Sequence, residues 1–170
     1  AESGAGEGRV GVKVLFIRRD NIGDLVCTTP AIRAVRLKFP LARIAVLVNS
    51  YNAGVVADNP DIDEVYVYEK EKHALSKGGG RLRVFMENLG VIRRIRKERF
   101  DVAVGCGCGY SARVARLAWL TGARHRAGFV SGKKPMSRFL YNLRAPEPRE
   151  AIHEVEAVMR LAALLGVSGP

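Results

Sequence analysis

The chain has 170 residues, of which 48% are hydrophobic, and this is enough for one domain with a buried core and too apolar for a disordered protein. No run approaches the roughly 18 apolar residues of a transmembrane helix, and the start AESGAGEG lacks the basic and apolar segments of a signal peptide. The formal net charge of +11 exceeds what solubility requires and indicates an anionic partner: nucleic acid, a membrane surface or an acidic substrate.

The composition gives no sign of disulfides or of a metal site. Three cysteines, Cys27, Cys106 and Cys108, are too few for a disulfide framework, so a reducing cytoplasm is the simplest setting. Cys106-Gly-Cys108 has no further ligands near it in the sequence, and we interpret these residues as small residues at a strand end. We expect no metal.

The stretch from residue 12 to residue 30 sets the pattern of the chain. The apolar run Lys13–Ile17 predicts a buried first strand, and a turn then leads to Asp24 at the mouth of a helix. Pro30 fits best as the first residue of a helix capped by Thr28 or Thr29, with Gly23–Cys27 as a separate entry turn. A continuous kinked helix is the alternative.

Strands and helices alternate along the rest of the chain. Further strands are predicted at Arg43–Val48, Glu64–Tyr68, Phe100–Val104 and His125–Phe129, and further helices at 82–98, Ser111–Thr121 and Ala151–Leu165. The alternation within Glu64–Tyr68 indicates a more exposed strand. Val130–Pro148 is basic and irregular, with at most a helical turn near Ser137–Tyr141. Five alternating strands predict an α/β, Rossmann-like, doubly wound parallel sheet.

Much of the charge lies in one segment, from Lys70 to Arg99. It holds ten Lys or Arg residues against three acidic residues, which is seven of the net +11 charges. Lys70–Arg81 contains a glycine triplet and is predicted to be a mobile loop. Basic residues around it could reach an anionic ligand at the carboxyl edge of the sheet, whereas Arg93 and Arg94 fit a solvated helix face.

Several common functions lack their signatures. There is neither a G-x-G-x-x-G turn nor a Walker A motif, and no nucleic-acid-binding signature occurs, so neither a bound nucleotide cofactor nor nucleic acid is expected. His153 is interpreted as a structural residue at the start of the last helix. Asp24 has two interpretations: a helix-entrance acid favoured by the dipole, or a general base at the ligand crevice.

The motifs, taken in order, resemble glycosyltransferase family 9, the ADP-heptose:lipopolysaccharide heptosyltransferases. The resemblance starts in IRRDNIGDLVCTTPAIRAVRLKFPLARIAVLV and covers nearly all of 12–167. The matching segments are Gly23-Asp24, Pro30-Ala31-Ile32, Pro40–Ile44, Asn59–Asp63, Phe100-Asp101, Leu120–Phe129, Pro135–Asn142 and His153-Glu154. Gly105–Cys108 departs from the family, where an acidic or polar residue is common.

The resemblance implies a GT-B architecture whose N-terminal half binds the acceptor and whose C-terminal half binds a nucleotide sugar, here ADP-heptose. Inverting transfer without a metal is implied, with Asp24 as the base. Acceptor contacts are implied for Arg18, Lys70, Lys72, Arg81, Arg83 and Lys133, and we assign Asn21 and Gly23 of the same turn to them. Residues 12–167 would form this domain, after a flexible tail at 1–11 and before an interdomain linker starting at 168–170.

The resemblance also sets the expected partners. They are an anionic glycolipid acceptor such as the lipopolysaccharide core, the inner face of the cytoplasmic membrane, and a donor-binding domain that lies outside these 170 residues. Without that domain we expect no sugar transfer. A non-enzymatic module that binds anionic glycan or lipid is one alternative, and a nucleotide- or nucleic-acid-binding domain is another.

Overall fold

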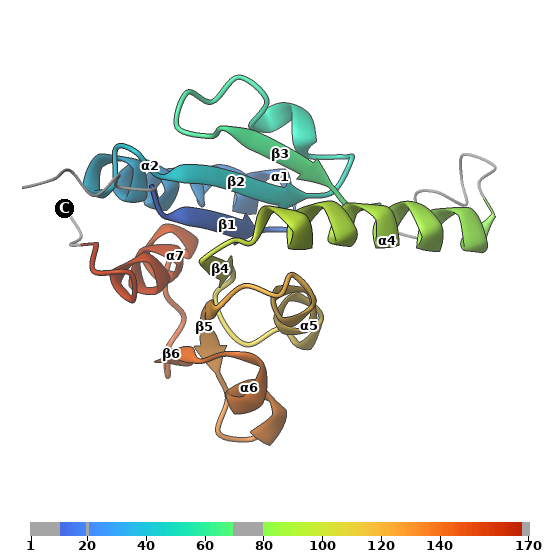
Figure 1. Ribbon diagram of the computed structural model, residues 1–170. Helices are drawn as coiled ribbons and strands as arrows, with labels where there is room; N and C mark the ends of the chain where they lie inside the picture. Colours follow the sequence, from blue (N-terminus) through green and yellow to red (C-terminus); the bar gives the residue numbers. More distant parts are fainter. Residues whose placement is uncertain (1–10, 20, 70–79, 168–170) are drawn as a thin grey trace, which may run out of the picture.

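The computed structural model describes residues 11–19, 21–69 and 80–167 (Figure 1). Three sequence predictions lie outside these residues almost entirely: the tail at 1–11, the loop that contains Lys70 and Lys72, and the linker at 168–170.

One parallel sheet of six strands forms the centre of the domain, in the order β3-β2-β1-β4-β5-β6. The strands are β1 (Lys13–Ile17), β2 (Arg43–Val48), β3 (Glu64–Val67), β4 (Val102–Gly105), β5 (His125–Val130) and β6 (Leu143–Pro146). The predicted Rossmann-like class is confirmed. The strand order reverses between β1 and β4, and a ligand crevice is expected outside the carboxyl ends of the strands at such a switch point. The predicted exposure of β3 is confirmed because it is an edge strand.

The prediction of five strands was wrong by one. Within the segment expected to be irregular, the chain forms helix α6 (Pro135–Leu140) and then β6, which pairs with β5 from Ala127↔Leu143 to Val130↔Pro146. Strand β6 reads LRAP, with Ala145 as its only buried residue, so its pattern is too short to be recognised. Pro146 is tolerated because β6 is an edge strand, where a missing N–H costs no ladder bond.

The turn after β1 is two helices, as the position of Pro30 predicted. Helix α1 (Ile22–Val26) ends before α2 (Thr29–Lys38), and Pro30 is in the first turn of α2, where its missing N–H is not needed. Thr28 is the N-cap residue of α2, as predicted, but its hydroxyl makes no capping hydrogen bond to α2 and instead donates to the carbonyl of Asp24 at 2.9 Å. This bond ties the two short helices together.

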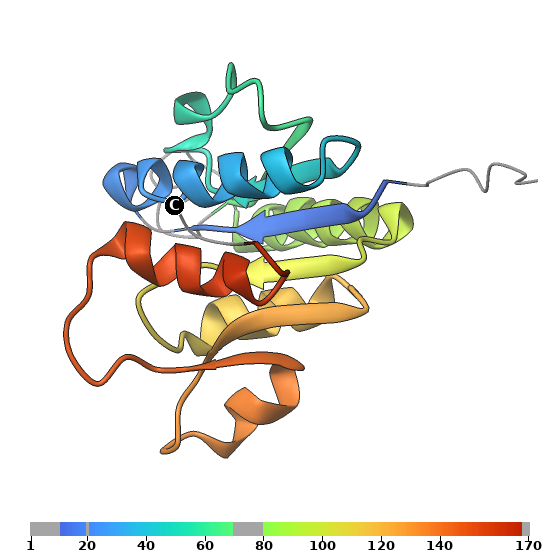
Figure 2. The ribbon, with the colours of Figure 1, turned by 90° about the vertical axis from the view of Figure 1, so that its left-hand side faces the viewer.

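Helices cover both faces of the sheet because side chains alternate along each strand (Figure 2). Val14 and Phe16 point to the face covered by α1, α2 and α7 (Glu154–Ala163), and Leu15 and Ile17 point to the opposite face. That second face is covered by α4 (Arg81–Glu98), α5 (Ala112–Leu120) and α6. A short 3₁₀ helix, η1 (Ala53–Val55), follows β2.

Helix α4 differs from its prediction at its first turns. It begins at Arg81, so that residue is helical rather than part of the loop. Leu82 and Phe85, expected on the apolar stripe, are 74% and 62% exposed. The buried side of α4 instead runs through Val84, Asn88 and Val91, and Asn88 holds the backbone after β3 by bonds to the N–H and carbonyl of Glu69.

Candidate active site

The carboxyl ends of the parallel strands form one edge of the sheet, where the predicted site residues of the first turn lie. The β1 strand continues in hydrogen bonding past its end, since the Arg18 N–H donates to the Leu47 carbonyl at 2.9 Å. The Cys106 N–H donates to the Ile17 carbonyl at 3.1 Å on the other side. Arg18 is therefore held between the ends of β2 and β4, next to the switch point.

Arg18 is the electrostatic centre of this edge. Its side chain is 3% exposed, yet it is paired with two carboxylates. Its Nη2 lies 3.2 Å from Asp24 Oδ2, and its Nη1 lies 2.5 Å from Glu154 Oε1. A buried guanidinium requires such compensation, because leaving a charge buried and unpaired costs several kcal/mol.

Asp24 is placed by the start of α1. Its Oδ2 accepts a long hydrogen bond, 3.4 Å, from the Asn21 N–H, in addition to the Arg18 contact. The side chain is 32% exposed, so the carboxylate is anchored by one oxygen and still reaches solvent. Gly23 lies beside it, and a Cβ added at Gly23 would meet nothing within 4 Å, which leaves open space over the turn. Asp24, Asn21, Gly23 and Arg18 thus form one cluster.

Glu154 has a second partner in the glycine-rich turn after β4. The Cys108 thiol donates to Glu154 Oε2, and burial, together with this hydrogen bond and the Glu154 charge, raises the pKa of Cys108 to about 11. The thiol therefore stays protonated near neutral pH and acts as a donor, not as a nucleophile. The turn that departs from the family pattern contributes a neutral group that supports Glu154.

A second group of residues lies beyond β5 and β6. Glu147 accepts a hydrogen bond from the Tyr110 N–H at 2.8 Å. A hydrogen bond from Ser131 and then the Tyr110 amide lower the pKa of Glu147, and the charge of Lys133 lowers it further. Lys133 is thus exposed beside an acid of its own chain. Arg81 and Arg83 are exposed in the first turn of α4, where Arg83 Nε donates to Glu87 at 2.8 Å.

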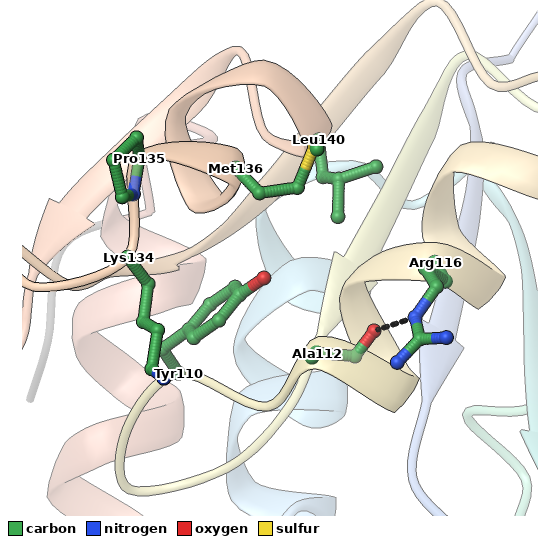
Figure 3. A pocket seen from close by; sticks show the side chains of 7 residues that line it. All are labelled: Tyr110, Ala112, Arg116, Lys134, Pro135, Met136 and Leu140. Atoms are coloured by element: carbon green, nitrogen blue, oxygen red, sulfur yellow. Dashed lines mark hydrogen bonds between the residues drawn. The ribbon is translucent and has the colours of Figure 1, made fainter.

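A pocket of about 590 Å³ opens between the start of α5 and helix α6 (Figure 3). Met136 and Leu140 of α6 face Tyr110 and Ala112 across it. Its remaining lining residues are Arg116, Lys134 and Pro135. These seven described residues include two cations and otherwise supply mainly apolar walls, and the pocket has the size of small-molecule sites.

Tyr141 packs closely against two glycines, one in β4 and one in β5. A Cβ at Gly105 would lie 2.1 Å from the Tyr141 hydroxyl, and a Cβ at Gly128 would lie 2.3 Å from its ring. Burial raises the pKa of Tyr141 far above its usual range, so the hydroxyl stays neutral. Glycine at the end of β4 and within β5 is required for the close approach of this ring.

The sequence identified part of this cluster and missed the rest. The predicted clustering includes Asp24, Arg18, Asn21 and Gly23, which are close together in the sequence. The pairing of Arg18 with Glu154 was not predicted. The only signal was the segment His153-Glu154, noted for its family likeness. The structural role expected for His153 fits its position as the cap of α7, where it accepts from the Val155 N–H at 3.2 Å.

Two absences concern the described residues alone. Within residues 11–19, 21–69 and 80–167, no three His, Cys, Asp or Glu side chains are gathered as a metal site would need. In the same ranges, none of the helices combines the length and hydropathy of a membrane-crossing segment.

The comparisons with known proteins point to one family. No family model matches the chain. A Haemophilus influenzae protein provisionally named a glycosyltransferase is 24% identical over 145 residues, which are 85% of this chain and 37% of that protein. Lipopolysaccharide heptosyltransferase 3 of Escherichia coli is 23% identical over 146 residues, 86% of this chain and 40% of its own length.

Solved structures share the fold. The glycosyl transferase family 9 protein of Veillonella parvula superposes with a TM-score of 0.73 at 22% identity, over 92% of this chain and 42% of that one. The E. coli heptosyltransferase WaaC with ADP gives 0.69 at 18% identity, over 94% of this chain and 48% of that one. The chain resembles glycosyltransferase family 9 in sequence and in fold. It spans half or less of the length of these relatives.

Proposed function

We propose that this chain is the acceptor-binding, N-terminal half of an inverting, metal-independent glycosyltransferase that adds heptose or a related sugar to a lipopolysaccharide core acceptor. One observation carries the proposal: Asp24, anchored on buried Arg18 and still 32% exposed, lies at the carboxyl edge beside the sheet's switch point. The fold that presents it is the one seen in heptosyltransferases.

The chemistry requires a base at this position. The oxygen of an acceptor hydroxyl attacks the anomeric carbon of the nucleotide sugar, and a new C–O bond forms as the bond to the diphosphate breaks. Asp24 takes the hydroxyl proton, and the nucleoside diphosphate, ADP for an ADP-heptose donor, leaves with the electron pair. General-base catalysis of this kind contributes about 10²–10⁴-fold to a rate.

The remaining cations of this edge would bind the acceptor. Arg116 and Lys134 stand on the pocket between α5 and α6, and its apolar walls suit the less polar parts of a glycolipid. Lys133 is adjacent, while Arg81 and Arg83 extend the basic surface along α4. The net charge of +11 suits an enzyme at the anionic inner face of the cytoplasmic membrane.

The donor would be bound by a C-terminal domain facing the same edge. The relatives are more than twice as long as the matched segment, which leaves room for such a domain in a complete enzyme. By this proposal the 170-residue chain binds acceptor but does not transfer sugar alone.

The test replaces the base in the complete enzyme. Asp24→Asn keeps the side-chain shape and removes the proton acceptor, so kcat should fall at least 100-fold while acceptor affinity, measured by calorimetry, stays within a few-fold. Asp58→Asn, an exposed carboxylate elsewhere on the domain, is the matched control and should leave kcat unchanged. Turnover of Asp24→Asn near that of the wild type would refute the assignment.

A further inference from the structure

Glu154 is connected to the proposed base through one buried side chain. Arg18 is separated from Glu154 by 136 residues in sequence, yet their atoms lie 2.5 Å apart and Arg18 is 3% exposed. The Glu154 side chain is itself only 17% exposed. Such a contact is shielded from solvent, so its electrostatic effect is larger than that of a surface ion pair.

The charges of Arg18 and Glu154 determine how strong a base Asp24 can be. If Arg18 were paired with Asp24 alone, the guanidinium would hold the carboxylate as an anion and weaken it as a base. Glu154 takes the shorter of the two contacts, 2.5 Å against 3.2 Å, so the guanidinium charge is shared. Glu154 therefore offsets part of the Arg18 charge that Asp24 would otherwise face alone.

We propose that Glu154 is a positioning residue for Asp24: it fixes the Arg18 guanidinium that anchors Asp24 and offsets the Arg18 charge so that Asp24 remains an effective base. The inference rests on the proposed function, in which Asp24 accepts the acceptor proton.

The contacts around the Arg18 guanidinium favour Glu154 as the residue that offsets its positive charge. Asp24 from α1 and Glu154 from α7 are ion-paired with Arg18 at the end of β1, and the Cys108 thiol from the turn after β4 donates to Glu154. Cys108 is a neutral donor to Glu154 Oε2, whereas Arg18 contacts the other carboxylate oxygen, Oε1. The thiol orients Glu154 without neutralising it.

The first experiment measures kcat against pH in the complete enzyme with Glu154→Gln. Glutamine keeps an oxygen for Arg18 and removes the charge, so Asp24 should bind its proton less tightly. The acid limb of the profile should move to lower pH, and kcat on the plateau should fall roughly tenfold with KM within about twofold. Glu156→Gln, on the same helix but paired with exposed Arg160 at 2.7 Å, is the matched control and should change neither.

Two outcomes overturn the inference. A Glu154→Gln profile that matches the Glu156→Gln profile removes any role for Glu154. A lower kcat with an unmoved acid limb reduces Glu154 to a structural residue.

The second experiment does not depend on activity. The side-chain carboxyl ¹³C resonance of Asp24 is followed with pH in the 170-residue chain, and its titration midpoint should be lower in Glu154→Gln than in wild type. An unmoved midpoint refutes the coupling. A lowered midpoint in an enzyme whose Asp24→Asn variant still turns over would keep the coupling and refute only the proposed base.

Discussion

The packing of Tyr141 on two glycines can be tested quantitatively. Gly105 and Gly128 each directly follow a residue of the Val104↔Ala127 pair, so they lie side by side on β4 and β5. A Cβ at Gly105 would lie 2.1 Å from the Tyr141 hydroxyl and 3.0 Å from the next ring atom. A Cβ at Gly128 would lie 2.3–2.5 Å from three ring carbons.

These distances predict that removing the Tyr141 hydroxyl oxygen relieves the Gly105→Ala substitution but not the Gly128→Ala substitution. Both overlaps exceed 1 Å relative to an ordinary contact of about 3.5 Å, so Gly105→Ala and Gly128→Ala should each cost about 1–3 kcal/mol of unfolding free energy. For a chain of this size that is a Tm decrease of roughly 3–10 °C. Tyr141→Phe removes only the hydroxyl. It should therefore recover about 1 kcal/mol or more of the Gly105→Ala cost and none of the Gly128→Ala cost.

The assay is equilibrium urea unfolding of the single and double variants, analysed as two double-mutant cycles. Gly90→Ala is the control, because a Cβ there meets nothing within 4 Å, and it should stabilise α4 by up to about 1 kcal/mol. Equal coupling of Tyr141→Phe to both glycine substitutions, or no coupling to either, would refute the assignment of the contact to the hydroxyl.

Two other predictions concern the surface of the candidate site. The double substitution Arg81→Ala with Arg83→Ala should weaken acceptor binding up to about tenfold and reduce its salt dependence, whereas Arg93→Ala with Arg94→Ala on the same helix should change neither. Binding is measured by calorimetry at two salt concentrations. If the two double variants have equal effects, the basic residues of α4 are only a solvated face. Because its hydrogen bonds lower the pKa of folded Glu147, this carboxylate stabilises the fold above the ordinary glutamate value, and the contribution is lost as pH falls through the lowered value. Glu147→Gln should therefore lower Tm at about pH 7 but not at about pH 3, and a Tm difference that persists in acid would contradict this.

The parts of the fold that the sequence predicted are those with a strong local pattern. Arg43–Val48 is a run of six residues, five of them buried, and its bounds were predicted without error. The split at Pro30 followed from the chemistry of one residue. Strand β6 could not be predicted because LRAP buries one side chain and forms only by pairing with β5.

The site was predictable only where its residues are adjacent in sequence. The turn at 21–24 and the end of β1 are close along the chain, so a crevice with Asp24 and Arg18 followed from the order of the elements. Arg81, Arg83 and Lys133 were assigned by family resemblance, and the structure places the last two beside acids of their own chain, Glu87 and Glu147. Local contacts of this kind leave no trace in composition or charge counts.

The contact between Arg18 and Glu154 depends on how α7 is packed. Ala157, Val158 and Leu161 of this helix are fully buried in the same cluster as Ile32 and Val35 of α2. Thr28, at the start of α2, donates to the carbonyl of Asp24 in α1. The helices that carry the two carboxylates paired with Arg18, α1 and α7, therefore both contact α2. A change that loosens α7 should therefore weaken the support of Asp24 before it unfolds the domain, since the 2.5 Å pairing tolerates less movement than apolar packing does.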